Sequence, residues 1–199
     1  TLSLHDALPI YISHYDVYRA PTGGAAVLIG SSNGTTYSDT AVPTDGSYDY
    51  DVVAVDGAGN QSVPSAATTV SVDLTPPTAP TGLTDAATLT ASKPSLSWTL
   101  STDGTGSGIV RYDVYRGAVL AGSSPGTTFT DTTLATNGSY AYTVKAVDAA
   151  GNQSAASSPL TVTWDSTPPP VPVGLTAITP TSAAPVLSWT SGGPAGDFD

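Results

Sequence analysis

The chain has 199 residues, enough for one large domain or two of ordinary size, and only five Lys and Arg stand against 16 acidic residues, giving a formal net charge of −11. This balance excludes a nucleic-acid-binding surface, which requires clustered positive charge, and the lack of cysteine excludes disulfides and thiol chemistry. Every acidic residue is Asp, methionine is absent, and Thr, Ser, Val, Gly and Pro are abundant. Strong helix formers are therefore scarce, and an all-β fold is predicted.

The first segment, TLSLHDALPI at residues 1–10, resembles the in-frame translation of a common DNA-sequencing adapter. Ten consecutive matches are hard to obtain by chance, although a native strand or linker remains the alternative. We exclude the segment and its His5 from functional reasoning, as one would a cloning scar. On this interpretation the sequence is expected to be a fragment of a longer gene product.

The rest of the chain repeats itself with a period of about 90 residues. The repeated segments are YDVYR at 15–19 and 112–116, GSYxYxVxAVD at 46–56 and 138–148, the Pro-rich DxTPP at 73–77 and 165–169, and LSWT at 96–99 and 187–190. Apolar residues alternate with polar ones within these segments, as in Tyr140, Tyr142 and Val144, which is the period of a half-buried strand. About seven short strands per repeat, separated by turn residues, indicate a β-sandwich.

Three motifs mark the middle repeat: Leu96-x-Trp98, Ile109-x-x-Tyr112-x-Val114, and Leu134 with Tyr140 six positions later. Together they resemble a fibronectin type III domain. The resemblance implies an immunoglobulin-like sandwich in which Trp98 is the core residue of strand B and Tyr140 forms the tyrosine corner of strand F. Similar modules occur in bacterial surface proteins and beside carbohydrate-active domains. The residues that it assigns to structural positions are Trp98, Tyr112, Val114, Leu134, Tyr140 and Trp189.

Alignment of the repeats divides the chain into tandem modules and joints. Only the middle module is expected to be complete, because the first lacks the counterparts of strands A and B and the third contains only those two. We therefore expect the first module not to fold stably alone, since its inner face has no second sheet to cover it. The predicted division is 1–10 adapter, 11–73 first module, 74–79 Pro-rich joint, 80–164 complete module, 165–171 Pro-rich joint and 172–199 third module.

Catalytic chemistry finds little support in the sequence. Outside residues 1–10 the chain has one histidine, His14, and neither Cys nor Glu. General acid–base or nucleophilic catalysis would have to rest on Asp, Ser and Tyr. His14 occupies the repeat position of Arg111 and is expected to face solvent. The chain is therefore predicted not to be an enzyme.

One metal site is predicted. In this fold the loops after strands B and F meet the end of the preceding module, which would bring Asp73, Asp103 and Asp148 together. Several carboxylates and nearby carbonyls form the oxygen-rich environment that Ca²⁺ requires, so calcium is the one cofactor considered. The alternative is that Asp148 accepts hydrogen bonds from its own turn, as Asp often does.

Ligand binding by aromatic side chains is a further possibility. Tyr18 and Tyr115 are expected on the outer face of strand C, and Trp164 ends strand G. Exposed aromatic rings could stack on a sugar. Alternatively, Trp164 closes the base of the module or the joint.

These observations predict non-catalytic spacer or presentation modules of a secreted or cell-surface bacterial protein, so the expected localisation is extracellular or at the cell surface. The partners are expected to be neighbouring domains of the same polypeptide, joined through stiff Pro-rich segments. The alternative function is polysaccharide binding or adhesion, accessory to a carbohydrate-active domain outside the chain. No stretch reaches the ~18 apolar residues of a membrane helix, so no membrane insertion is expected.

Overall fold

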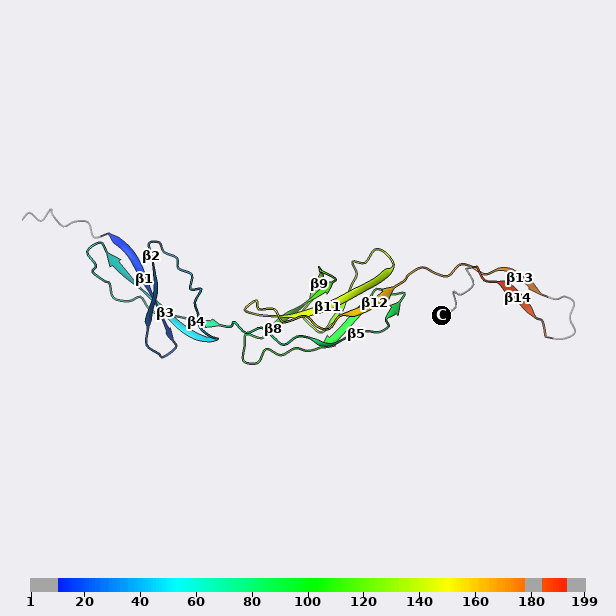
Figure 1. The fold of residues 1–199 in the computed structure, drawn as a ribbon, viewed down its shortest axis with the longest axis horizontal. Helices are drawn as coiled ribbons and strands as arrows, with labels where there is room; N and C mark the ends of the chain where they lie inside the picture. The colour runs from blue at the N-terminus through cyan, green and yellow to red at the C-terminus, as the bar shows by residue number, and fades with distance from the viewer. Residues whose placement is uncertain (1–10, 178–183, 193–199) are drawn as a thin grey trace, which may run out of the picture.

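The computed structural model describes residues 11–177 and 184–192 of the chain. Within these residues the secondary structure consists of strands alone, arranged as three units along the long axis of the molecule (Figure 1). No helix long and apolar enough to cross a membrane occurs in these two segments. The all-β prediction is confirmed, and the tandem arrangement is visible as a string of separate sheets.

The first unit is a single antiparallel sheet. Its strands lie in the order β2-β1-β3-β4, so the two longest strands are central. On pairing with β2, strand β1 shifts register between Val17 and Tyr18, and the same shift recurs between Val114 and Tyr115 in the middle unit. The sequence repeat is thus also a repeat of backbone geometry. The strands are β1 (Ile12–Pro21), β2 (Val27–Ser32), β3 (Gly46–Asp56) and β4 (Thr68–Val72).

The middle unit is a two-sheet sandwich. One sheet has the order β10-β7-β5, and the other has the order β6-β12-β11-β8-β9. All pairs are antiparallel except β6 with β12, which run parallel. The first sheet consists of β5 (Thr81–Asp85), β7 (Ser95–Thr99) and β10 (Thr128–Thr130). The second consists of β6 (Leu89–Thr90), β8 (Ile109–Arg116), β9 (Val119–Ser124), β11 (Gly138–Asp148) and β12 (Leu160–Trp164).

The core of the middle unit lies between these two sheets. Trp98 of β7 meets Tyr112 of β8 edge to face, with ring centroids 5.4 Å apart and an interplanar angle of 61°, a favourable geometry for two aromatic rings. Leu134 is buried, and the hydroxyl of half-buried Tyr140 donates to the carbonyl oxygen of Thr136 at 2.6 Å, which is a tyrosine corner. The fully buried members of this core are Leu96, Tyr112, Val114, Tyr142, Val144, Ala146 and Val162.

The third unit is a hairpin of β13 (Val173–Ala177) and β14 (Leu187–Thr190), paired antiparallel. The sequence places Trp189 in a core, but 61% of this residue is exposed, against 6% for the corresponding Trp98. The expectation of a buried Trp189 is therefore wrong for this structure. The physical reason is that no other strand of the described chain pairs with or covers this hairpin.

Candidate functional site

The joint between the first and middle units is held by hydrogen bonds to backbone groups of the middle unit. The N–H of Thr78 donates to the carbonyl oxygen of Thr102 at 2.8 Å, and the N–H of Thr102 returns a bond to the Thr78 hydroxyl, also at 2.8 Å. Asp73, just after β4, accepts a hydrogen bond from the N–H of Ser107 at 2.7 Å. The joint is thus bonded to the loop that connects β7 and β8.

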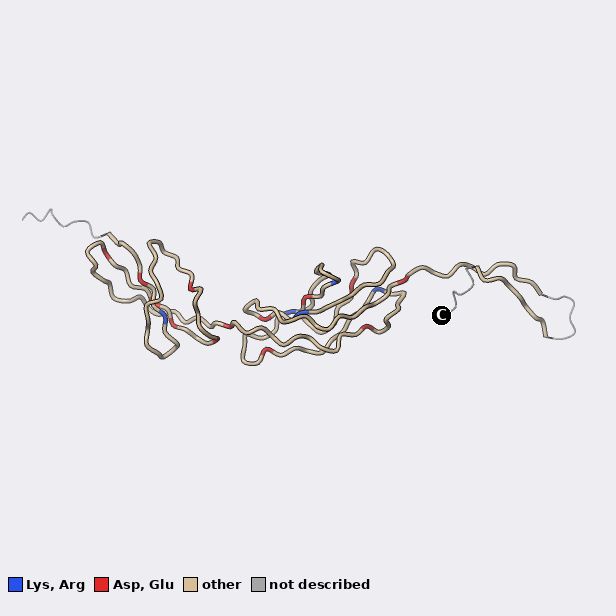
Figure 2. Tube along the Cα trace, viewed as in Figure 1, with Lys and Arg blue, Asp and Glu red and all other residues tan. Residues whose placement is uncertain are grey.

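Three carboxylates meet at this joint. Asp73 follows β4, Asp103 lies in the loop after β7, and Asp148 ends β11; each offers one oxygen, and these oxygens lie within 4.8 Å of one another. The three residues that the sequence predicts as calcium ligands are therefore close together in space. Figure 2 shows that the Asp, Lys and Arg residues of the described chain lie in the first and middle units and the joints that follow them, and that the β13–β14 hairpin carries none.

The carboxylate of Asp148 is buried and already has hydrogen-bond partners. Its Oδ1 accepts from the backbone N–H of Asn152 at 2.8 Å, and its Oδ2 accepts from the Asn152 side-chain amide at 2.8 Å. The same amide donates to the carbonyl oxygen of Asp73 at 3.1 Å. Asp148 therefore caps its own turn, which is the alternative role considered from sequence, and Asn152 links that turn to the joint.

The other two carboxylates differ in how their oxygens are satisfied. Hydrogen bonds from Ser107 hold the pKa of Asp73 below its usual range, so this group stays ionised. The Oδ2 of Asp103 accepts from the N–H of Gly108 at 2.7 Å, but its Oδ1 is buried and has no hydrogen-bond partner. A buried unpaired oxygen is costly, and a hard cation could satisfy it. The calcium site stays a prediction.

The three aromatic residues proposed as ligand contacts lie in different environments. Tyr18 and Tyr115 are half-buried at equivalent positions of separate units, and the Lys145 ammonium lies 5.7 Å from the centroid of the Tyr115 ring. Trp164 is buried, its indole N–H donates to the carbonyl oxygen of Ala91 at 3.3 Å, and the Lys93 ammonium lies 4.3 Å from the centroid of its ring. In this structure its ring is therefore not exposed as a stacking platform, and its role as a ligand contact stays a prediction.

A buried ionic network occurs in the middle unit that the sequence reasoning did not find. Asp131, fully buried, accepts hydrogen bonds from Arg116 at 2.5 Å and from the Tyr142 hydroxyl at 2.9 Å. Burial by itself would raise the pKa of Asp131, but hydrogen bonds from Thr133 and Tyr142 and the guanidinium of Arg116 lower it below its usual range. Burial and the neighbouring carboxylate raise the pKa of Tyr142.

The first unit contains the same network. Arg19 donates to Asp39 at 2.6 Å, and the Tyr50 hydroxyl donates to the same carboxylate at 2.9 Å. Because Asp39 and Asp131 occupy the same repeat position, comparison of the two repeats could have revealed the pair. In the middle unit the network joins β8 and β11 of the larger sheet to the loop that follows β10 of the smaller sheet, which is a structural role.

His14 also has a structural setting. Its Nε2 lies 3.5 Å from Oδ1 of Asp16, and Arg111, at the same repeat position, lies 3.0 Å from Asp113. The histidine is half-buried on strand β1 and takes the place of an ion-pairing arginine. Nothing in this arrangement positions His14 against a hydroxyl nucleophile of the described residues other than the neighbouring Ser13, whose Oγ lies 3.4 Å from Nδ1.

The chain is similar in sequence to parts of bacterial enzymes and similar in fold to β-sandwich domains. A scan against models of protein families finds no match. Exoglucanase B of Cellulomonas fimi is 41% identical over 191 residues, which cover 90% of this chain and 17% of that enzyme. Chitinase A1 of Niallia circulans is 44% identical over 157 residues, 76% of this chain and 21% of that enzyme. The chain thus spans about a fifth of the length of these curated relatives.

Among solved structures, the FN1–FN3 domains of chicken CNTN1 superpose with a TM-score of 0.57 at 15% identity, covering 77% of this chain and 54% of that one. At this identity the likeness concerns the fold alone. The chain has the fibronectin type III fold, as the sequence resemblance predicts, in tandem copies.

Proposed function

We propose that the chain is a non-catalytic run of fibronectin type III modules that spaces other domains of a secreted bacterial polysaccharide-degrading enzyme. Two observations carry the proposal: the described chain is a string of small β units, one of them a complete sandwich, and it matches only about a fifth of its relatives, an exoglucanase and a chitinase. A matching stretch this small leaves the larger part of each enzyme for other domains. Because such enzymes attack polymers outside the cell, an extracellular location belongs to the same proposal.

The joint supports a spacer of defined geometry. Hydrogen bonds from Ser107 and Asn152 to Asp73, and from Thr102 to Thr78, tie the end of the first unit and the Pro-rich segment to the middle unit, and prolines restrict the backbone further. A segment held in this way keeps consecutive modules in line, as Figure 1 shows for the first and middle units. We infer that the modules hold the other domains of the enzyme at a defined distance and take no part in bond cleavage.

The test replaces the matched segment of Cellulomonas fimi exoglucanase B with this chain, and compares it with a deletion and with a Gly/Ser linker of equal length. A spacer predicts that the deletion lowers activity on an insoluble glucan, that this chain restores it more fully than the flexible linker, and that activity on a soluble substrate is unchanged throughout. If the deletion has no effect on insoluble substrate, the spacer role is wrong.

The alternative, polysaccharide binding by the modules themselves, rests on Tyr18 and Tyr115 at the outer face of their sheets. Sedimentation of the isolated chain with insoluble glucan and chitin tests it directly. Retention that is lost in the Tyr115→Ala variant would favour binding over spacing. Absence of retention favours the spacer.

A further inference from the structure

Two asparagine–glycine steps occur in the chain, at Asn33-Gly34 and at Asn137-Gly138. Asparagine is thermolabile because its side-chain amide can be lost, and a following glycine favours the loss, since no side chain hinders attack by its peptide nitrogen on the carboxamide carbon. Both asparagines are exposed, so access to water does not distinguish them. Their hydrogen bonds differ, and this difference decides which step can react.

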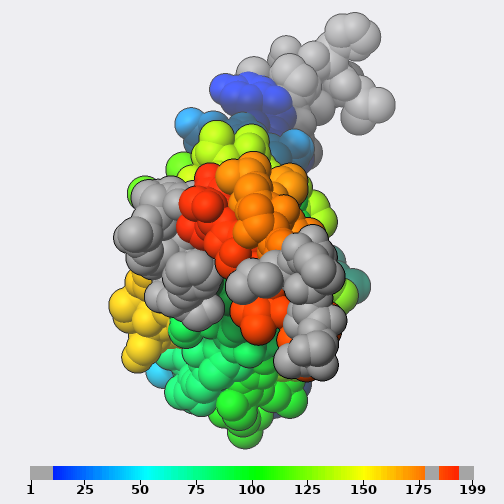
Figure 3. All heavy atoms as spheres, turned by 90° about the vertical axis from the view of Figure 1, so that its right-hand side faces the viewer, coloured from blue at the N-terminus to red at the C-terminus, as the bar shows by residue number. Residues whose placement is uncertain are grey.

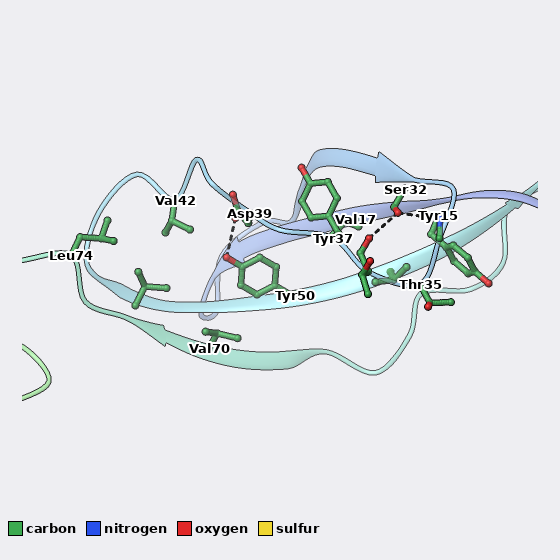
Figure 4. Close-up of a pocket in the computed structure, with 14 residues that line it drawn as sticks. Tyr15, Val17, Ser32, Thr35, Tyr37, Asp39, Val42, Tyr50, Val70 and Leu74 are labelled. Atoms are coloured by element: carbon green, nitrogen blue, oxygen red, sulfur yellow. Dashed lines mark hydrogen bonds between the residues drawn. The ribbon is translucent and has the colours of Figure 1, made fainter. Parts of the chain in front are cut away.

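The carboxamide of Asn33 is free. It lies in the bend after β2 and forms no hydrogen bond with the residues that the structure describes. In Figure 4 the step lies between the labelled Ser32 and Thr35, and the dashed lines at Ser32 mark the bonds of its hydroxyl with the backbone. The N–H of Gly34 donates to that hydroxyl at 3.2 Å, which is long for such a bond. The space beside Gly34 is open, because an added Cβ would meet only the Ser32 Oγ, at 3.9 Å.

The carboxamide of Asn137 is held by both of its polar atoms. Its Nδ2 donates to Oδ1 of Asp165 and to Oγ1 of Thr167, each at 2.6 Å. Its Oδ1 accepts from the N–H and the hydroxyl of Ser166 at 3.1 and 3.0 Å. Rotation of this carboxamide toward the nitrogen of Gly138 would break these bonds, so the attack is hindered. The bonds lie where the chain leaves the middle unit for the β13–β14 hairpin, which faces the viewer in Figure 3 (orange and red).

We propose that Asn33 is a site of spontaneous deamidation, with water as the only co-reactant, and that the bonds of Asn137 protect the second asparagine–glycine step. The Gly34 nitrogen gives its proton to solvent and bonds to Cγ of Asn33, the Cγ–Nδ2 bond breaks, and ammonia leaves. Water then opens the cyclic imide: cleavage at Cγ gives aspartate, and cleavage at the original peptide carbonyl gives isoaspartate. Either product adds a negative charge to a chain of net charge −11, and isoaspartate also lengthens the main chain of the loop.

The middle unit supplies a matched control. The sequence SSNGTTY around Asn33 recurs there as SSPGTTF, in which Pro125 takes the place of the asparagine. The N–H of Gly126 donates to the Ser124 hydroxyl at 3.2 Å, the same distance as in the first unit. The backbone of this bend is therefore compatible with proline, and Asn33→Pro should remove the reactive amide without disturbing the loop.

The experiment incubates the whole chain at mildly alkaline pH and follows both steps by peptide mapping with mass spectrometry, which detects the exchange of NH₂ for OH and separates aspartate from isoaspartate. We expect Asn33 to react at least about tenfold faster than Asn137, because release of the Asn137 bonds raises the barrier. In denaturant these bonds are lost, and the two rates should agree within about twofold. Equal rates in the folded chain, or faster loss at Asn137, overturn the proposal.

Three variants test the mechanism and the protection separately. Asn33→Pro should abolish the modification in the first unit. Gly34→Ala should slow it at least about tenfold, since the added carbon hinders the attack; the glycine has no positive φ and the space is open, so the loop should keep its shape. Asp165→Ala combined with Thr167→Val removes both acceptors of the Asn137 amide and should speed the reaction there while leaving the Asn33 rate unchanged. An unchanged Asn33 rate in Gly34→Ala refutes the mechanism, and an unchanged Asn137 rate in the double variant refutes its protection by the joint.

Discussion

Replacement of the buried carboxylate in the middle unit, Asp131→Asn, is expected to lower the stability of that module by about 3 kcal/mol. Asp131 accepts four hydrogen bonds, from Arg116, from the Tyr142 hydroxyl, and from the N–H and hydroxyl of Thr133. An asparagine keeps the shape but turns an N–H₂ group toward donors and leaves the guanidinium without its counter-ion. Removal of one partner from a buried ion pair costs about 3–5 kcal/mol. The Arg116 side chain keeps 25% exposure and can regain water, which favours the lower value.

Tryptophan fluorescence follows this module selectively. Trp98 and Trp164 are buried there, the first unit has no tryptophan, and Trp189 of the third unit is already largely exposed, so its emission changes little on unfolding. For a module of this size each kcal/mol lowers the melting temperature by about 4–8 °C, so the expected shift is about 12–24 °C. The matched control is Asp39→Asn, which breaks the same network in the first unit and should leave the tryptophan transition unchanged. A D131N transition within about 2 °C of the parent, well below that shift, would refute the reasoning.

The direction of the Asp131 pKa shift predicts how the stability of the middle module depends on pH. The pKa of Asp131 is lower in the folded module than in the unfolded chain, where a value of about 3.9 applies. Its contribution to stability is therefore fully present above about pH 4 and is lost as pH falls through the folded-state pKa. The parent module should lose stability below about pH 4, and D131N should lose less over the same interval.

Four further results are expected. Trp98→Ala should cost about 3–5 kcal/mol by leaving a cavity, and the same change at exposed Trp189 should leave the middle-unit transition unmoved in a dilute sample; equal effects would contradict the assigned burial. Gly122→Ala should cost about 1–3 kcal/mol, because the added carbon would meet an aromatic ring at 2.7 Å; a neutral result in chemical denaturation would mean that the ring moves aside. Added Ca²⁺ should raise the melting temperature and chelation lower it, with loss of the effect in Asp103→Asn, whereas an unchanged melt excludes calcium at the joint. Limited proteolysis of a dilute sample should cut 11–73 well before the middle unit; equal protection would show that the single sheet is stable alone.

The sequence was sufficient for the fold and for most of the middle-unit core. Period-two alternation decides which side of a strand is buried, and the repeat shows which segments are equivalent, so the buried positions of Trp98, Tyr112 and Val114 follow from the sequence. The proximity of three carboxylates also followed from where their loops end. The strand order of the fibronectin type III fold is enough to place these loops at the same end of the module.

The errors and omissions have a common physical cause. Sequence periodicity shows which face of a strand a side chain lies on, but it does not show which other element packs against that face. Trp189 lies on a strand as expected, yet no other strand of the described residues covers it, and Trp164 ends a strand, yet it is buried with the Lys93 ammonium over its ring. The Asp131 pair depends on a contact between a loop and a strand that no local pattern encodes.

The parallel pairing of β6 with β12 has a mechanical consequence. The polypeptide enters the middle unit through β5, continues into β6 and leaves through β12; β6 and β12 are joined by hydrogen bonds from the N–H of Thr163 to the carbonyl oxygen of Thr88 at 2.7 Å and from the N–H of Asp165 to that of Thr90 at 3.0 Å. Tension applied along the polypeptide therefore loads these bonds together and in shear, where they must break at once and cannot be peeled in turn. The two-residue strand β6 therefore resists such tension together with β5, which is paired with β7 in the other sheet.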